Sequence, residues 1–170
     1  ELKTLDKKVI PKKGRNITKS TITAGVVPVV AGGLTPAYYH NVHNVTGPAI
    51  TISASGANAG FVNLYHQDIW ASDCSYISKK EISYVYSSYL FFKSRQDEIT
   101  QMQQGAAQPH VYPKDLFRLV LADPPADVWL TMASIVTPLF EFIKSNREQI
   151  SSLSEIRDTL LPKLLSGEVI

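Results

Sequence analysis

The side chains of this sequence best suited to bind a metal ion are its four histidines and its single cysteine. His40 and His43 are close enough in sequence to share a metal, with His66 and Cys74 as more distant candidates. Structural zinc needs four ligands at defined spacing, and the sequence contains no Cys-x-x-Cys pair. We therefore predict no metal site and interpret these histidines as hydrogen-bonding or surface residues.

Patterns typical of catalytic sites are incomplete. Ser53 and Ser55 do not lie in a Gly-x-Ser-x-Gly elbow, and no pair of carboxylates stands where a cleft is expected. The segment Gly56–Gly60 is not followed by the Gly-Lys-Ser/Thr of a phosphate-binding loop. Asp123–Ala126 is similar to the Asp-Pro-Pro-aromatic motif of amino-methyltransferases, but Ala126 has no ring to stack on a flipped base. We predict that the chain is not an enzyme and binds no cofactor.

Cationic and neutral polar residues are separated along the chain. Residues 1–20 contain seven Lys or Arg against two acids, whereas residues 20–67 contain no Asp, Glu, Lys or Arg. Lys and Arg position a protein on DNA through phosphates, while neutral polar and aromatic side chains can read base edges. A basic terminus can also be only a solvated tail, and polar loops also suit a sugar. The division predicts phosphate contacts from Lys12, Lys13, Arg15 and Lys19, and base contacts from Tyr38, Tyr39, His40, Ser55 and Asn58.

Short strands joined by tight turns are expected in the first part of the chain, because β-branched runs alternate with glycine and proline. In residues 51–55 polar side chains alternate with small or apolar ones, which predicts a strand with one solvent-exposed face, paired with the 61–64 run. One amphipathic helix is expected from Tyr84 to about Gln103, with Ser83 as its N-cap. Strands are predicted at 26–30, 50–53, 61–64, 74–78 and 117–121.

The C-terminal part of the chain has the spacing of a long helix. We interpret Pro138 as its first turn and place its end near Leu161, which gives a length of roughly 35 Å. Apolar residues follow alternating steps of four and three, the seam of a coiled coil, in which Asn146 would set the register. The predicted interface consists of Met132, Ile135, Leu139, Phe142, Asn146, Leu153, Ile156 and Leu160.

These patterns predict an α+β fold: a small mixed or antiparallel β-rich domain with a packed helix, followed by a long coiled-coil-forming helix. We place the domain at residues 1–125 and the helix at 126–170, with the junction at Asp123-Pro124-Pro125. The longest apolar runs are shorter than the roughly 20 residues that a membrane span requires, and one cysteine suits a reducing compartment. We therefore expect a cytoplasmic protein that does not enter a membrane. The first residue is Glu1 rather than Met, which is typical of a part of a longer protein.

The tail Leu153–Ile170 resembles the closing motif of the specificity subunits of type I restriction-modification enzymes. Other segments agree with the same family in order, so that the resemblance spans nearly the whole chain. These segments are Lys13–Lys19, Pro28–Gly33, Ile52–Val62, Trp70–Cys74 and Gly105–His110.

The resemblance implies that residues 1–125 are a DNA target-recognition domain and that 126–170 are the conserved spacer helix. It implies sequence-specific recognition of one half of a bipartite target in double-stranded DNA. The chemistry would belong to a methyltransferase subunit and a motor-nuclease subunit, which are the implied protein partners. A full subunit usually carries two such units with antiparallel helices, so this chain is either one half or a half-sized subunit that dimerises.

One segment departs from the family pattern. Many members begin the spacer with an acidic residue and Gln after Pro-Pro, where this chain has Ala126–Leu130. Two alternatives stay open from the residues alone. One is a methyltransferase fragment, which would bind S-adenosylmethionine, and the other is a β-rich module that binds a sugar or another polar ligand.

Overall fold

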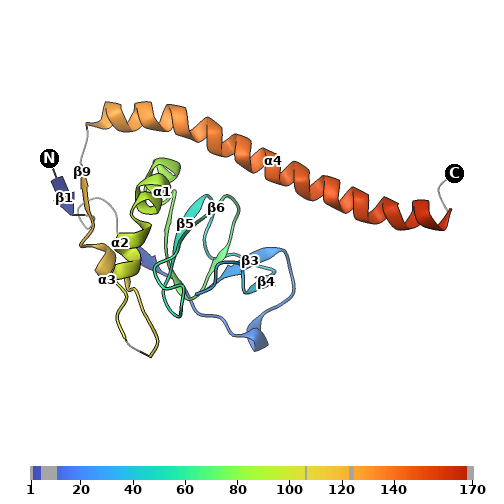
Figure 1. Ribbon diagram of the computed structural model, residues 1–170, viewed down its shortest axis with the longest axis horizontal. Coiled ribbons are helices and arrows are strands. Elements are labelled where there is room, and N and C mark those ends of the chain that lie inside the picture. The colour runs from blue at the N-terminus through green and yellow to red at the C-terminus, as the bar shows by residue number, and fades with distance from the viewer. Residues whose placement is uncertain (1, 5–10, 106, 123–124, 168–170) are drawn as a thin grey trace. The chain divides into compact units, whose positions relative to one another are not determined.

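The computed structural model describes residues 2–4, 11–105, 107–122 and 125–167 (Figure 1). The chain divides into two compact units, residues 1–133 and residues 134–170. The first unit contains the strands and short helices, and the second contains most of the long helix α4. We describe each unit by itself.

The central sheet of the first unit has the strand order β2 (Lys12–Lys13), β8 (Cys74–Ser78), β5 (Ala49–Ser53) and β6 (Val62–Tyr65). All neighbouring strands in it are antiparallel. The predicted hairpin is confirmed, because β5 and β6 pair directly across a short turn. The strand predicted at 74–78 is also confirmed.

A second sheet covers one face of the central sheet and consists of β4 (Tyr38–His40), β3 (Val27–Val30) and β7 (Trp70–Ala71). The prediction that residues 51–55 form a strand with one solvent-exposed face is wrong, because all of β5 is buried. Thr51 is only 2% exposed. The second sheet causes this burial through a core cluster that joins the two sheets: Val30, Val45, Ala49, Ile69, Ala71 and Cys74.

Two helices lie on the other side of the central strands, α1 (Val85–Ser94) and α2 (Gln96–Gln101) (Figure 1). The prediction of one continuous helix over 84–103 is wrong, because the chain leaves helical geometry at Arg95 (φ −107°, ψ 22°). The predicted N-cap is wrong as well, since the N-cap is Tyr84. Just after the break, the Gln96 amide accepts from Val62 N at 2.9 Å and donates to Gly60 O at 2.9 Å. These contacts join α2 to the start of β6.

The end of the first unit contains a short helix, α3 (Pro113–Leu116), and a strand, β9 (Val120–Ala122). Strand β9 pairs antiparallel with β1 (Leu2–Thr4). The predicted strand at 117–121 therefore begins too early, because the chain still turns at 117–118 after α3. Most of the predicted junction, Asp123-Pro124, lies outside the described residues, as do Lys7 and Lys8 of the basic N-terminus.

Helix α4 (Ala126–Ser166) contains 41 residues. At about 1.5 Å per residue it is roughly 60 Å long. The predicted start at Pro138 and end near Leu161 are wrong, because Pro138 and Pro162 both lie inside the helix. Each removes one backbone N–H donor, yet the surrounding sequence keeps the helix continuous. No described helix is both long and apolar enough to cross a membrane.

Candidate nucleic-acid interface

The basic N-terminal segment is held along the edge of the central sheet. After β2, the backbone N–H of Gly14 donates to Cys74 O at 2.8 Å, and that of Arg15 donates to Ala71 O at 2.9 Å. A Cβ atom at position 14 would collide with the carbonyl oxygen of Ser72, which explains the glycine. The segment therefore runs toward the end of the sheet where β8 begins and carries Arg15 to that end.

Lys12 is paired within the chain, 2.8 Å from the carboxylate of Glu81. The buried Glu81 side chain also accepts from Ser78 N at 2.9 Å and Ser78 Oγ at 2.7 Å. The hydrogen bond to Glu81 raises the pKa of Lys12. Burial favours a higher pKa for Glu81, but the hydrogen bonds from Lys12 and Ser78 outweigh it and hold this pKa below its ordinary value. Lys13, Arg15 and Lys19 have no ion pair within the described part of the chain.

We predict that Glu81→Gln lowers the free energy of unfolding by about 1 to 2 kcal/mol near neutral pH, because hydrogen bonds to a charged group are lost. The folded-state pKa of Glu81 lies below its unfolded value of 4.5, so its stabilisation is present above that pH. It disappears as the pH falls through the folded-state pKa. Denaturant unfolding at several pH values should therefore show that the free energies of unfolding of Glu81→Gln and the unmodified protein become more similar in acid. Glu98→Gln, in an exposed pair with Arg95, is the control and should have little effect.

Trp70 connects the basic segment to the second sheet. Its indole N–H donates to Arg15 O at 2.8 Å, and the Arg15 guanidinium lies 6.0 Å from the ring centroid. The ring of His40 packs edge-on against it with the centroids 5.2 Å apart. No local pattern in the sequence predicts a role for Trp70. The sequence points to Trp70 only because it lies in Trp70–Cys74, one of the segments that resemble the family.

Strand β4 carries three of the predicted base contacts. Tyr38 and Tyr39 are exposed, with 40% and 54% of their surface accessible. His40 is buried, with Thr23 N at 3.1 Å from its Nδ1 atom. The structure therefore presents the two tyrosines at the surface and packs His40 inside the first unit.

The turn between β5 and β6 carries the other two predicted base contacts. Gly56 and Gly60 both have positive φ, at 81° and 84°, and Gly60 N donates to Ser53 O at 2.8 Å. The Ser55 hydroxyl donates to the carboxylate of Asp73. The half-exposed Asn58 side chain has no hydrogen bond to any described residue. Arg15, Ser55 and Asn58 are thus brought to the same end of the central sheet.

The histidines and the cysteine considered as metal ligands are dispersed. His43 lies 3.4 Å from Asp68, and His66 lies 3.4 Å from the hydroxyl of Tyr86. Cys74 is buried, and burial raises its pKa to about 12. Among the described residues, no three or more His, Cys, Asp or Glu side chains are grouped in a way that suits a metal ion.

Comparison with known proteins assigns the family. Residues 4–155 match the family model of the type I restriction modification DNA specificity domain. The chain belongs to this family. The specificity domain is 34% identical over 97 residues to the type I restriction enzyme MjaIX specificity subunit of Methanocaldococcus jannaschii, a match that covers 57% of the chain and 22% of that relative.

Solved structures show the same fold. The S subunit of the type I restriction-modification system from M. genitalium superposes with a TM-score of 0.75 at 21% identity, over 98% of the specificity domain and 46% of that chain. The HsdS subunit of Thermoanaerobacter tengcongensis gives a TM-score of 0.55 at 14% identity, over 99% and 45%. The domain thus spans less than half the length of each of these relatives. The predicted α+β fold with a long C-terminal helix is confirmed, and the family favours DNA recognition over the two alternatives.

Proposed function

We propose that this specificity domain recognises a particular sequence in double-stranded DNA, as one half of a bipartite target. The observation that supports this most is that Arg15 and Asn58 lie at one end of the same sheet. Among the described residues, Arg15 has no ion pair and the Asn58 side-chain amide has no hydrogen bond. Cations bind phosphates of any sequence, whereas an amide placed in the groove distinguishes base pairs. One surface therefore combines the two kinds of contact that sequence recognition needs.

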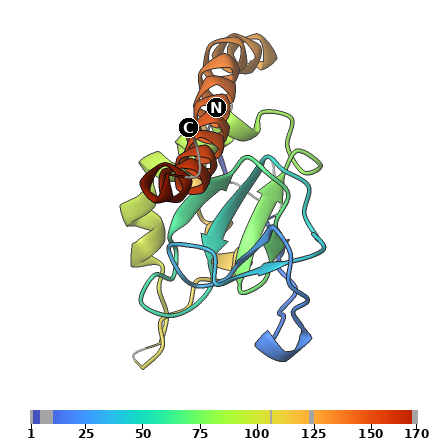
Figure 2. The same cartoon turned by 90° about the vertical axis from the view of Figure 1, so that its right-hand side faces the viewer.

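The proposed phosphate contacts are Lys13, Arg15 and Lys19. Lys13 and Arg15 are exposed along the sheet edge, and Lys19 begins the short 3-10 helix η2 (Lys19–Thr21). In Figure 2 this helix, in blue, projects from the lower end of the first unit. Lys12 belongs to the same predicted set, and its pairing with Glu81 indicates the weakest contribution of the four.

The proposed base contacts are Tyr38, Tyr39, His40, Ser55 and Asn58, all of which the sequence predicts. An Asn side chain can donate and accept together, which matches the N6 and N7 atoms of adenine in the major groove. Ser55 is positioned by Asp73, and the two tyrosines are exposed on β4. His40 would need to leave its buried place beside Trp70 to reach a base.

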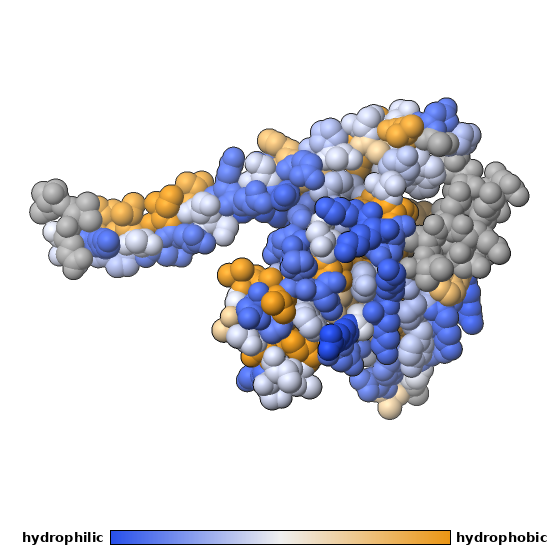
Figure 3. Space-filling view, turned by 180° about the vertical axis from the view of Figure 1, so that it is seen from behind, coloured by the Kyte–Doolittle hydropathy of each residue, from blue (hydrophilic) through white to orange (hydrophobic). Residues whose placement is uncertain are grey.

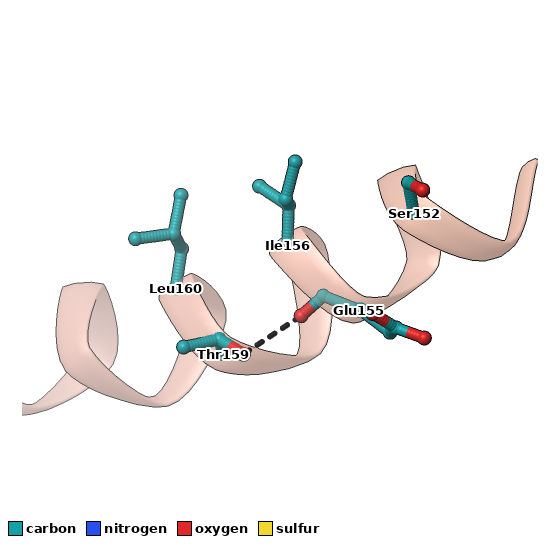
Figure 4. Close-up of a pocket in the computed structure, with 5 residues that line it drawn as sticks. All are labelled: Ser152, Glu155, Ile156, Thr159 and Leu160. Carbon is teal, nitrogen blue, oxygen red and sulfur yellow. Dashed lines mark hydrogen bonds between the residues drawn. The ribbon is translucent and has the colours of Figure 1, made fainter. Parts of the chain in front are cut away.

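Helix α4 is proposed to pair with the helix of a second recognition unit. Its seam is open to solvent, with Leu139 60% and Leu153 64% exposed, and Asn146 is half-buried within it. Figure 3 shows orange residues on one side of the C-terminal part of α4 and blue residues on the other. In Figure 4, Ile156 and Leu160 project to the same side beside a shallow hollow. Such a one-sided apolar stripe is typical of a coiled coil.

The second recognition unit is either another copy of this chain or a further unit of a longer chain. We propose that the paired units hold a methyltransferase subunit and a motor-nuclease subunit on the target in the cytoplasm. In this proposal the specificity domain makes and breaks no covalent bond.

The DNA contacts are tested by replacing Lys13, Arg15 and Lys19 with Ala in the assembly with the methyltransferase subunit. We expect weaker binding to every duplex. The slope of log K against the logarithm of the salt concentration should become less steep by about 2 to 3, because each phosphate contact contributes about 0.9 to this slope. Replacing Lys79 and Lys80 with Ala removes exposed cations at the other end of β8 and should leave the slope unchanged. An unchanged slope in the triple variant would rule out the phosphate role.

A further inference from the structure

A segment distant in sequence from the Ser55–Gly60 turn is joined to it in the fold. Gly56 N donates to Pro109 O at 3.0 Å, and Val111 N donates to Ala54 O at 2.9 Å. Ser55 and His110 form an antiparallel bridge between these two hydrogen bonds. Residues 109–111 therefore lie directly beside the turn that carries Ser55 and Asn58.

The loop that precedes this contact is closed and held from inside the domain. Gln104 and His110 exchange backbone hydrogen bonds at 2.9 and 2.8 Å, which close the loop at its base. The Gln104 side chain donates to the fully buried carboxylate of Asp115 at 2.9 Å, and Tyr112 N donates to its other oxygen at 2.9 Å. Figure 2 shows this loop, in yellow, projecting from the same lower end as η2.

Exposed cationic and aromatic groups follow the loop. The rings of His110 and Tyr112 are stacked, 5.7 Å apart and 9° from parallel, and Lys114 Nζ lies 5.5 Å from the Tyr112 centroid. Lys114 and Arg118 are exposed and have no ion pair among the described residues.

Two described carboxylates beside this segment, Asp115 and Asp73, accept hydrogen bonds from other groups. Asp115 is bonded inside the domain, and Asp73 accepts from Ser55. Neither carboxylate forms an ion pair with Lys114 or Arg118, so both cations stay available for a ligand. Its loop also presents Gln108, an exposed amide without a side-chain partner in the described part of the chain.

We propose that residues 104–105 and 107–118 form a second contact strip for the same DNA half-site, with Lys114 and Arg118 on phosphates and Gln108 on a base edge. The inference rests on the proposed DNA recognition and extends its site. Charge along the sequence predicts phosphate contacts only in the N-terminal segment, because Lys114 and Arg118 lie in a nearly neutral part of the chain. The fold joins residues 109–111, which precede them, to the turn that carries Asn58.

The phosphate part is tested with K114A/R118A in the assembly with the methyltransferase subunit, on the preferred duplex and on an unrelated duplex. The loss of two phosphate contacts should make the slope of log K against the logarithm of the salt concentration less steep by about 2. It should weaken binding to both duplexes by the same factor. K79A/K80A is the matched loss of two exposed cations and should change neither value. All three lysines and Arg118 are exposed, and thermal unfolding of each variant checks that the fold is kept.

The possible results distinguish a failure of the contact strip from a failure of the proposed DNA recognition. If K114A/R118A keeps the full slope while the variant lacking Lys13, Arg15 and Lys19 loses it, DNA recognition stands and the strip is wrong. If neither variant lowers the slope, the proposed function itself fails. Gln108→Ala should change the ratio of affinities between the preferred duplex and its single-base variants, and an unchanged ratio would remove Gln108 from the site.

Discussion

A chain carrying Leu139→Asp and Leu153→Asp is expected to remain monomeric at concentrations where the unmodified chain pairs through α4. The two residues lie two heptads apart on one seam and are both exposed. Replacing a buried leucine by a small residue typically costs about 2 to 5 kcal/mol. Two such losses, with a charge added to each seam position, should weaken pairing by roughly a thousandfold or more. Sedimentation over a concentration series measures this directly.

The matched control adds the same charges to the opposite face of the helix. Thr137 and Ser151 are exposed and each lies two residues, or about 200°, before a seam leucine. T137D/S151D should therefore pair as the unmodified chain does. If both double variants behave alike, pairing does not use this seam.

Asn58→Ala is expected to change which DNA sequence is preferred with a smaller effect on binding to unrelated sequences. A well-placed amide contact contributes about 1 to 3 kcal/mol of discrimination, so preference at one base pair should fall by roughly tenfold to a hundredfold. Its backbone does not have positive φ, so alanine fits the turn. The measurement compares the affinity of the assembled complex for the preferred duplex and for duplexes changed at single positions.

Gln67→Ala is the control for Asn58. Gln67 is an exposed amide that follows β6, at the other end of the hairpin from the turn. Its loss should leave the preference unchanged. An equal loss of affinity for all duplexes in Asn58→Ala would mean that the residue does not read a base.

Local patterns were enough to predict the hairpin and the strand at 74–78, because glycine turns and β-branched runs act over a few residues. The burial of Thr51 was not predictable in this way, since it depends on a second sheet built from residues 27–71. The prediction that the long helix begins at Pro138 was wrong for a related reason. Proline is common in the first turn of a helix, and only the whole of α4 shows that it lies inside.

The candidate site shows the same division. Uneven charge indicated Lys13, Arg15 and Lys19 from the sequence, but the pairing of Lys12 with Glu81 joins positions far apart in the chain. Neighbouring residues in the sequence also do not indicate that Trp70 contacts Arg15 or that His110 pairs with Ser55. Sequence patterns therefore identified residue types suited to DNA, and the fold determined which of them share a surface.

Selection of bound sequences from a randomised duplex pool, with the methyltransferase subunit present, tests DNA recognition most directly. We expect strong enrichment of one short half-site, arranged as a palindrome if two copies of this chain pair through α4, since a two-fold dimer presents identical readers to both halves. A pool that stays random after repeated rounds, while the complex still binds DNA, would contradict sequence recognition by this domain.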